Sequence, residues 1–259
     1  MAAKILVMSD ESGHHAQETT ESRRGCAILV HGYGVRGFFW DALKAELQSE
    51  FREILTPDFH MESVEEGVGD LVELVRSRSR AHGEPVVLIG HSLGGIVSAL
   101  AARELSRFEA SHLVVMASPY GEMGSGGVSS LLRLIVRFKL VPGWMIRARF
   151  FGPDVPRETQ SELFSKAVSE SDGLRDLSTQ KKWFHTGAFP DPLEQAVLVI
   201  ASSWDRIVSP ESTMAFADEL SAERVKLPRS ARVGHNDFGY WPPAARRTAS
   251  EIRDFLARH

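Results

Sequence analysis

A serine between glycines is the strongest chemical signal in this sequence. The segment Gly90–Gly94 reads Gly-His-Ser-Leu-Gly, which fits the pattern G-x-S-x-G with Ser92 at its centre. It lies between an apolar run that ends at Ile89 and a helical pattern that begins at Leu93, so we expect Ser92 on a sharp strand-to-helix turn. The N–H of Leu93 at the helix N-terminus would stabilise a developing oxyanion. The segment therefore predicts a serine nucleophile, and the alternative is a serine N-cap beside packing glycines.

An attacking serine needs a base and an acid that orients this base, and neither has to be near it in sequence. Asp205 lies four residues beyond the apolar run Val197–Ala201, and His235 follows the next expected strand. The order Ser92, Asp205, His235 is the order that sheet hydrolases use. Three other loop acids could orient the base: Asp191, Glu194 and Asp237. We favour Asp205, because Asp191 precedes the strand and Asp237 is only two positions from the histidine.

A glycine-rich turn supplies the second part of an oxyanion site. The segment His31–Gly34 follows the apolar run Cys26–Val30 and opens the loop before the first major helix. A second backbone N–H for the oxyanion comes from this place in such an architecture. We assign it to Tyr33, with Gly34 as the next choice, and His31 has either a catalytic or a purely local role.

The elements around these residues alternate between strands and helices. Expected strands cover Cys26–Val30, Glu53–Thr56, Pro85–Ile89, His112–Ala117, Gln195–Ala201 and Arg224–Leu227, and expected helices cover Phe38–Gln48, Val64–Arg80, Leu93–Arg107, Glu211–Leu220 and Pro242–Ala257. The strands Pro85–Ile89 and His112–Ala117 are nearly continuous in apolar residues, as strands buried on both faces are. The alternation predicts an α/β fold with a mostly parallel central sheet and helices on both faces.

Residues 119–190 interrupt this alternation and are too many for a plain loop, so we expect an inserted helical cap. The hydrolase core is then residues 25–118 and 191–259, preceded at 1–24 by an edge strand and a mobile polar loop. The helical pattern over Val128–Leu140 has a broad apolar face, which we interpret as an ordinary packed helix, with a mobile interfacial lid as the alternative. From this face we expect the substrate-binding residues Leu131, Leu132 and Ile135, and Trp144 after the helix is the fourth. The cap holds 10 Lys and Arg against 7 Asp and Glu, which we interpret as a solvated face, with attraction of an anionic substrate as the alternative.

The composition is that of an ordinary globular protein. Of 259 residues, 43% are hydrophobic, and 30 basic against 34 acidic residues give a net charge of −4. This balance provides no general attraction for nucleic acid. The single cysteine, Cys26, cannot form an intramolecular disulfide and fits a reducing compartment, so we expect a cytoplasmic protein. The apolar run near the N-terminus is too short for a signal peptide or a stable membrane span.

Taken together, the segments Val30–Gly34, Gly90–Gly95 and Trp204–Val208 and the pair Gly234–His235 resemble the α/β-hydrolase superfamily, particularly its small esterases and lipases. The resemblance covers most of the chain from Gly25 onward. It implies the α/β-hydrolase fold and a Ser-His-Asp triad, without identifying a substrate. One departure is the N-terminus, which has room for a single edge strand where the family often has two.

The reaction expected from these residues is hydrolysis of a carboxylic ester with an apolar acyl or alcohol part. It proceeds through an acyl-enzyme and needs no metal or cofactor, and the only expected partner is the small-molecule ester. A thioesterase or an acyltransferase would use the same triad. From a different class of protein, a catalytically silent hydrolase fold that serves as a small-molecule receptor is the remaining alternative.

Overall fold

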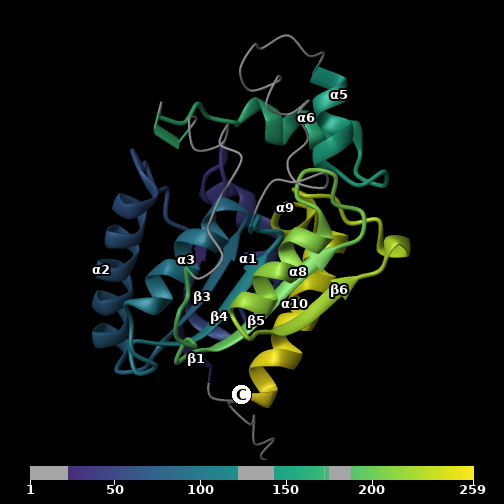
Figure 1. The fold of residues 1–259 in the computed structure, drawn as a ribbon. Coiled ribbons are helices and arrows are strands. Elements are labelled where there is room, and N and C mark those ends of the chain that lie inside the picture. Colours follow the sequence, from purple (N-terminus) through teal and green to yellow (C-terminus); the bar gives the residue numbers. More distant parts are fainter. Residues whose placement is uncertain (1–22, 122–142, 172, 175–187) are drawn as a thin grey trace, which may run out of the picture.

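The computed structural model describes residues 23–121, 143–171, 173–174 and 188–259. Its centre is a six-stranded sheet in the order β2-β1-β3-β4-β5-β6, in which every pair of neighbouring strands is parallel (Figure 1). The strands are β1 (Arg24–Val30), β2 (Phe51–Leu55), β3 (Val86–His91), β4 (Ala110–Met116), β5 (Ala196–Ser202) and β6 (Glu223–Leu227). The predicted fold class is confirmed.

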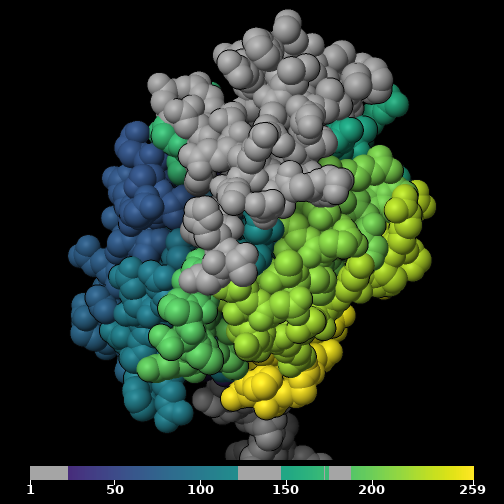
Figure 2. All heavy atoms as spheres, in the orientation of Figure 1, coloured from purple at the N-terminus to yellow at the C-terminus, as the bar shows by residue number. Residues whose placement is uncertain are grey.

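The predicted chemical residues all follow strands of this sheet. Ser92 comes directly after β3, the His31–Gly34 loop after β1, Asp205 after β5 and His235 after β6. Because parallel strands end at the same edge, these loops share one edge of the sheet. Two helices of the range 119–190, α5 (Gly143–Phe150) and α6 (Arg157–Ser165), lie beyond that edge, and the C-terminus lies at the opposite end (Figures 1 and 2). The domain boundaries proposed for the cap and the N-terminal segment stay predictions.

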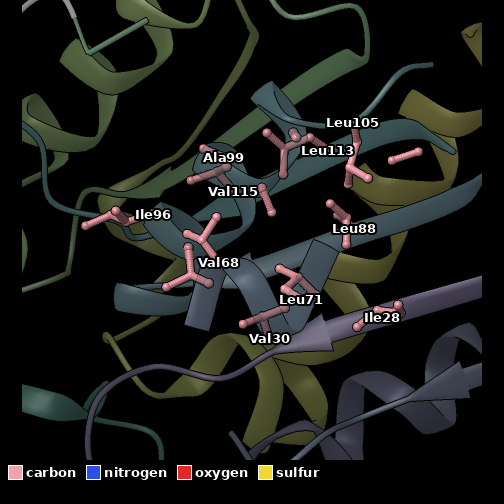
Figure 3. Packing of buried hydrophobic residues seen from close by; sticks show 14 of the residues in the cluster. Ile28, Val30, Val68, Leu71, Leu88, Ile96, Ala99, Leu105, Leu113 and Val115 are labelled. Carbon is pink, nitrogen blue, oxygen red and sulfur yellow. The ribbon is translucent and has the colours of Figure 1, made fainter. Parts of the chain in front are cut away.

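Both faces of the sheet are covered by apolar side chains. Ile28 and Val30 of β1 point into one buried cluster, which also contains Leu88 and Val115 of neighbouring strands (Figure 3). Their neighbours in sequence, such as Leu29, belong to a second cluster on the other face. Successive side chains of a strand point to opposite faces, so a strand buried on both sides must be apolar throughout. This explains the continuous apolar runs in the sequence.

The helices divide between these two clusters. The first cluster is formed with α2 (Val64–His82), α3 (Leu93–Arg103) and α8 (Pro210–Glu219), and the second with α1 (Asp41–Leu47) and α10 (Pro242–Arg258). The helix α2 begins at the N-cap Ser63, whose hydroxyl accepts from the Glu66 N–H, and ends at Gly83 in the left-handed conformation. No helix in the described part of the chain is long and apolar enough to cross a membrane.

Two helix predictions were wrong at their ends. The helix expected over Leu93–Arg107 stops at Arg103, because the Ser106 N–H bonds to the Glu109 carboxylate at 3.0 Å and closes a separate turn. The helix expected from Phe38 begins as a 3₁₀ turn, η1 (Gly37–Trp40), before α1. Two short elements had not been predicted: η2 (Arg229–Ala231) and α9 (Asp237–Tyr240).

Candidate functional site

Ser92 occupies a strained turn between β3 and α3. Its backbone angles are φ 54° and ψ −121°, a region that residues other than glycine adopt at a cost of about 1–3 kcal/mol. The turn is held by the Ser92 N–H, which donates to the Met116 carbonyl at 2.9 Å. Ser92 is half-buried, whereas His91 and Leu93 on either side are buried. The turn therefore presents the serine at the surface of the site and leaves the Leu93 N–H as the first N–H of α3, without an intrahelical acceptor.

Glycines allow this turn to form. A Cβ atom on Gly90 would meet the Gly94 and Gly95 backbone, and one on Gly94 would overlap the carbonyl oxygens of Val30 and His31. Strand β1 and helix α3 therefore approach each other at backbone distance. The spacing G-x-S-x-G is required by this close contact.

A pair of glycine substitutions tests the contact. Gly94→Ala should lower the free energy of unfolding by about 3 kcal/mol, because its methyl group overlaps backbone atoms that cannot rotate away. Gly69→Ala on α2 is the matched control, since a Cβ there meets nothing within 4 Å. It should stabilise the protein by about 0.5–1 kcal/mol through helix propensity. Urea denaturation measures both, and equal effects would contradict the assigned contact.

His31 has a structural role in the loop beside Ser92. Its Nε2 accepts from the Phe59 N–H at 3.2 Å, so Nδ1 carries the proton and donates to the Gly32 carbonyl at 2.9 Å. Burial lowers the pKa of His31, which keeps the ring neutral. This side chain fixes the loop that packs against Ser92: a Cβ on Gly32 would lie 3.0 Å from the Ser92 Cβ. Of the two roles expected for His31, the local one is favoured.

The two residues considered for the second oxyanion N–H differ in their surroundings. The Gly34 N–H donates to Glu170 Oε1 at 2.8 Å, and the Gly34 carbonyl accepts from the Val168 N–H at 3.0 Å. The same carboxylate forms a buried ion pair with Arg36 at 2.7 Å, with side-chain exposures of 4% and 8%. Because the Gly34 N–H is occupied, the geometry favours Tyr33, whose role stays a prediction.

Asp205 and His235 form a buried hydrogen bond. His235 Nδ1 lies 2.8 Å from Asp205 Oδ2, and the two side chains are only 4% and 1% exposed. The other carboxylate oxygen, Oδ1, accepts from the N–H groups of Ile207 and Val208 at 2.8 and 3.0 Å. Since a carboxylate can only accept, Nδ1 carries the imidazole proton and Nε2 carries the lone pair. This is the tautomer that can take a proton from a hydroxyl.

His91 connects the serine turn to the histidine loop. Its Nε2–H donates to the His235 carbonyl at 2.8 Å, and the two rings lie 4.7 Å apart. The other face of His91 stacks on Phe39 at 4.6 Å. Burial lowers the pKa of His91 well below its usual value, so the ring is neutral. The residue next to Ser92 therefore fixes the backbone that carries His235.

The sequence profile of the alpha/beta hydrolase family matches residues 27–249, which include Ser92, Asp205 and His235. The chain belongs to the alpha/beta hydrolase family.

Distant relatives of this alpha/beta hydrolase are esterases. The chain is 27% identical over 258 residues to a pimeloyl-[acyl-carrier protein] methyl ester esterase of Aliivibrio fischeri, in an alignment that covers 93% of this chain and 96% of the relative. A solved esterase of Thermogutta terrifontis is 21% identical with a TM-score of 0.68, over 91% of this chain and 90% of its own. A lipase-esterase related protein of Clostridium acetobutylicum has a TM-score of 0.71 at 15% identity, over 90% and 95% of the two chains. These structures support the fold.

The structure of this alpha/beta hydrolase brings some of the predicted site residues together. Asp205 and His235 are in direct contact, and Ser92 is linked to them through His91. The predicted substrate-binding residues Leu131, Leu132 and Ile135 lie outside the described residues. Trp144 belongs to α5, but its side chain is also outside what the structure describes. The rival acid Asp191 is exposed and lines another pocket, whose lining also includes Arg103 but neither Asp205 nor His235.

Asp237, the other rival acid near the histidine, bonds to backbone groups and not to the imidazole. Its Oδ2 accepts from the Gly234 N–H at 2.6 Å and from the Gly152 N–H at 2.8 Å, and the residue is fully buried. Next to it, the Asn236 N–H donates to the Phe150 carbonyl at 2.8 Å. Asp237 therefore fastens the end of α5 to the loop that carries His235.

The buried position of Asp237 predicts a pH dependence of stability. Burial raises the pKa of Asp237 from 3.8 to about 7, assisted by the Asp205 charge and opposed by the two N–H donors and by His235. The folded carboxyl thus binds a proton more tightly than the unfolded one. Its contribution to stability is complete below about pH 4 and is lost as the pH rises towards 7, by about 4 kcal/mol in total.

Asp237→Asn should remove this dependence, because the amide resembles the protonated carboxyl at every pH. The free energy of unfolding of the wild type minus that of the variant should fall by several kcal/mol between pH 4 and pH 7.5, because only the wild type has a carboxyl that loses its proton. Chemical denaturation of both proteins along this range measures it. Parallel stability curves would show that Asp237 does not titrate there.

Two parts of the site had not been predicted from the sequence. One is the Arg36–Glu170 ion pair, whose members are 134 residues apart, and the other is the fastening role of Asp237. From its sequence alone Arg36 would be expected at the surface, because arginine is rarely buried without a partner. Nothing in the sequence pointed to Glu170 or Gly152 as partners.

Proposed function

We propose that this alpha/beta hydrolase cleaves carboxylic esters with an apolar acyl or alcohol part, with Ser92 as nucleophile, His235 as base and Asp205 as the orienting acid. The observation that carries the proposal is the buried hydrogen bond of 2.8 Å between Asp205 and His235, beside a serine on a strained strand-to-helix turn. A surface serine or an isolated histidine needs neither feature. The esterase names of the distant relatives support the reaction class.

In this mechanism Ser92 Oγ attacks the ester carbonyl carbon while His235 Nε2 takes the hydroxyl proton. The resulting imidazolium is stabilised by Asp205, and the carbonyl oxygen, now an oxyanion, accepts from the N–H groups of Leu93 and Tyr33. His235 then returns the proton to the departing alkoxide, which leaves as an alcohol. A water molecule attacks the acyl-enzyme through the same sequence and releases the carboxylic acid.

Two measurements on the purified protein test this function. A fluorophosphonate should label Ser92 covalently, because only an activated serine attacks the phosphorus, and peptide mapping identifies the modified residue. A series of p-nitrophenyl esters of increasing chain length, run beside acyl-thioesters, then gives kcat/KM for each class. Faster thioester cleavage would identify a thioesterase. A protein that is neither labelled nor active would be the catalytically silent receptor instead.

A further inference from the structure

A pocket rich in arginine lies beside the acid loop. Its volume is about 600 Å³, and it opens between the end of α5, the start of α6 and the loop after β5. In Figure 2 the teal atoms of the α5 region border the yellow-green atoms of the later chain at the upper right. The lining includes Arg147, Arg157, Arg206, Trp204 and Gln160, and no carboxylate lines it among the described residues. The described lining therefore carries three positive charges and no negative one.

Two of these arginines have no acidic partner in the described part of the chain. Arg206 lies over the Trp204 ring, with its guanidinium carbon 5.1 Å from the ring centroid, and forms no ion pair there. No ion pair is formed by Arg157 either within the described ranges, whereas Arg147 donates to the Ser161 hydroxyl at 2.6 Å. An arginine held on an aromatic ring keeps its planar set of donors available for an oxyanion.

Further positive charge surrounds the same tryptophan. Arg229 and Arg232 lie 4.9 and 6.0 Å from the Trp204 ring centroid. Of these two, Arg232 forms an ion pair with Asp154 at 3.1 Å, and both side chains are about half exposed. Because water screens such an exposed pair, it is a weak interaction. The loop after β5 and the turn after β6 thus present a mainly positive surface towards α6.

The start of α6 adds backbone donors to this surface. Arg157 is the first residue of the helix, and its N-cap residue, Pro156, makes no side-chain cap bond. Unpaired N–H groups and the helix dipole favour an anion at such an end. Glu158 in the same turn is exposed and does not line the pocket. The start of α6, with Arg157, and Arg206 on the loop after β5 belong to different elements and favour the same kind of ligand.

The pocket is adjacent to the proposed catalytic residues. Trp204 and Arg206 are the two neighbours of Asp205 in sequence, and both line the pocket. Phe151 in the pocket wall follows Phe150, whose ring lies 6.1 Å from the His235 ring. A ligand bound there would thus contact both sequence neighbours of Asp205, and also Phe151, the residue after the Phe150 whose ring lies near His235.

We propose that this pocket binds a carboxylate or phosphate group on the substrate, away from the ester that is cleaved. This inference rests on the proposed ester hydrolysis and narrows it to esters that carry such a distal oxyanion. Bidentate hydrogen bonds from Arg157 and Arg206 are the recognition expected for either group. A pocket of about 600 Å³ admits a small acidic group with its spacer, not a folded protein.

Binding is tested first in Ser92→Ala, which cannot turn over an ester and therefore separates recognition from catalysis. Isothermal titration with glutarate and with inorganic phosphate should show saturable binding, and comparing them shows which oxyanion is preferred. When Arg157→Gln or Arg206→Gln is added to the Ser92→Ala protein, the Kd of the preferred ligand should rise about tenfold. This is the loss expected for one partly exposed hydrogen bond to a charged group. Arg247→Gln is the matched control, because it removes the same charge from an exposed position on α10.

Selectivity is then measured in the active enzyme. Monomethyl dicarboxylates of increasing length are compared with methyl esters of fatty acids of the same length, and with methyl esters that end in a phosphate monoester. The wild type should favour one anionic series over the neutral one. Each pocket variant should reduce this ratio of kcat/KM about tenfold, whereas the control Arg247→Gln should leave the ratio and the rate on neutral esters unchanged.

Several results would overturn the proposal. Unchanged binding in both pocket variants, or the same loss in Arg247→Gln, would show a general charge effect. Binding without any selectivity for anionic esters would show that the pocket does not serve the substrate. If no ester is cleaved at all, the proposed function fails, while the titrations on Ser92→Ala still decide whether the pocket binds oxyanions.

Discussion

Replacement of Ser92 by alanine should lower the rate of ester hydrolysis by a factor on the order of 10⁴ to 10⁶. The hydroxyl is the attacking group, and the remaining parts of the site can only bind and polarise the ester. The fold should be unaffected, since the half-buried side chain fills no core position and the Ser92 N–H keeps its bond to the Met116 carbonyl. The measurements are kcat/KM on a p-nitrophenyl ester and the free energy of unfolding.

Ser98→Ala is the matched control for this substitution. Ser98 lies on the same helix, α3, and is fully buried, and its hydroxyl has no hydrogen-bond partner among the described residues. Its removal should change neither activity nor stability by much, because no bond is lost and an unsatisfied polar group disappears. Substantial activity in Ser92→Ala would mean that another residue is the nucleophile.

The fold could be predicted because its signals are local. The period of two in strands buried on both faces makes runs such as Cys26–Val30 almost wholly apolar, and each run became a strand of the parallel sheet. The end of a helix is harder to predict, because side chains compete with the helix for backbone hydrogen bonds. Ser106 and Glu109 form a turn that ends α3 early, and the apolar pattern of the helix does not indicate this turn.

The site was predictable wherever the order of strands determined it. Residues that follow parallel strands meet at one edge, so Ser92, Asp205 and His235 could be grouped before their contacts were known. The contacts that hold the loops in place could not be predicted from the sequence. Asp237 bonds to Gly152, 85 residues away, and Glu170 bonds to Gly34, 136 residues away. Such pairs follow from how residues 151–171 pack on the sheet edge, and no spacing in the sequence encodes that packing.

Asp205→Asn should be the most damaging change among the acids, with a loss on the order of 10⁴ in kcat, the size known for this substitution in a triad. The amide oxygen would take the place of Oδ1, which accepts from the N–H groups of Ile207 and Val208. The amide nitrogen would then face His235 Nδ1 as a donor. To accept this hydrogen bond, the imidazole must carry its lone pair at Nδ1 and its proton at Nε2. In this tautomer Nε2 cannot accept the serine proton.

The choice of acid is decided by comparing this variant with Asp191→Asn and Asp237→Asn at the same pH. Asp191 is exposed and away from the histidine, so its amide variant should keep wild-type kcat. Asp237→Asn should change stability far more than kcat, because its bonds go to the backbone of Gly152 and Gly234. The Asp205→Asn protein should stay folded, since both backbone donors keep an acceptor. If Asp237→Asn lost activity to the same degree while Asp205→Asn remained active, the bond between Asp205 and His235 would be structural, and Asp237 would be the acid on which catalysis depends.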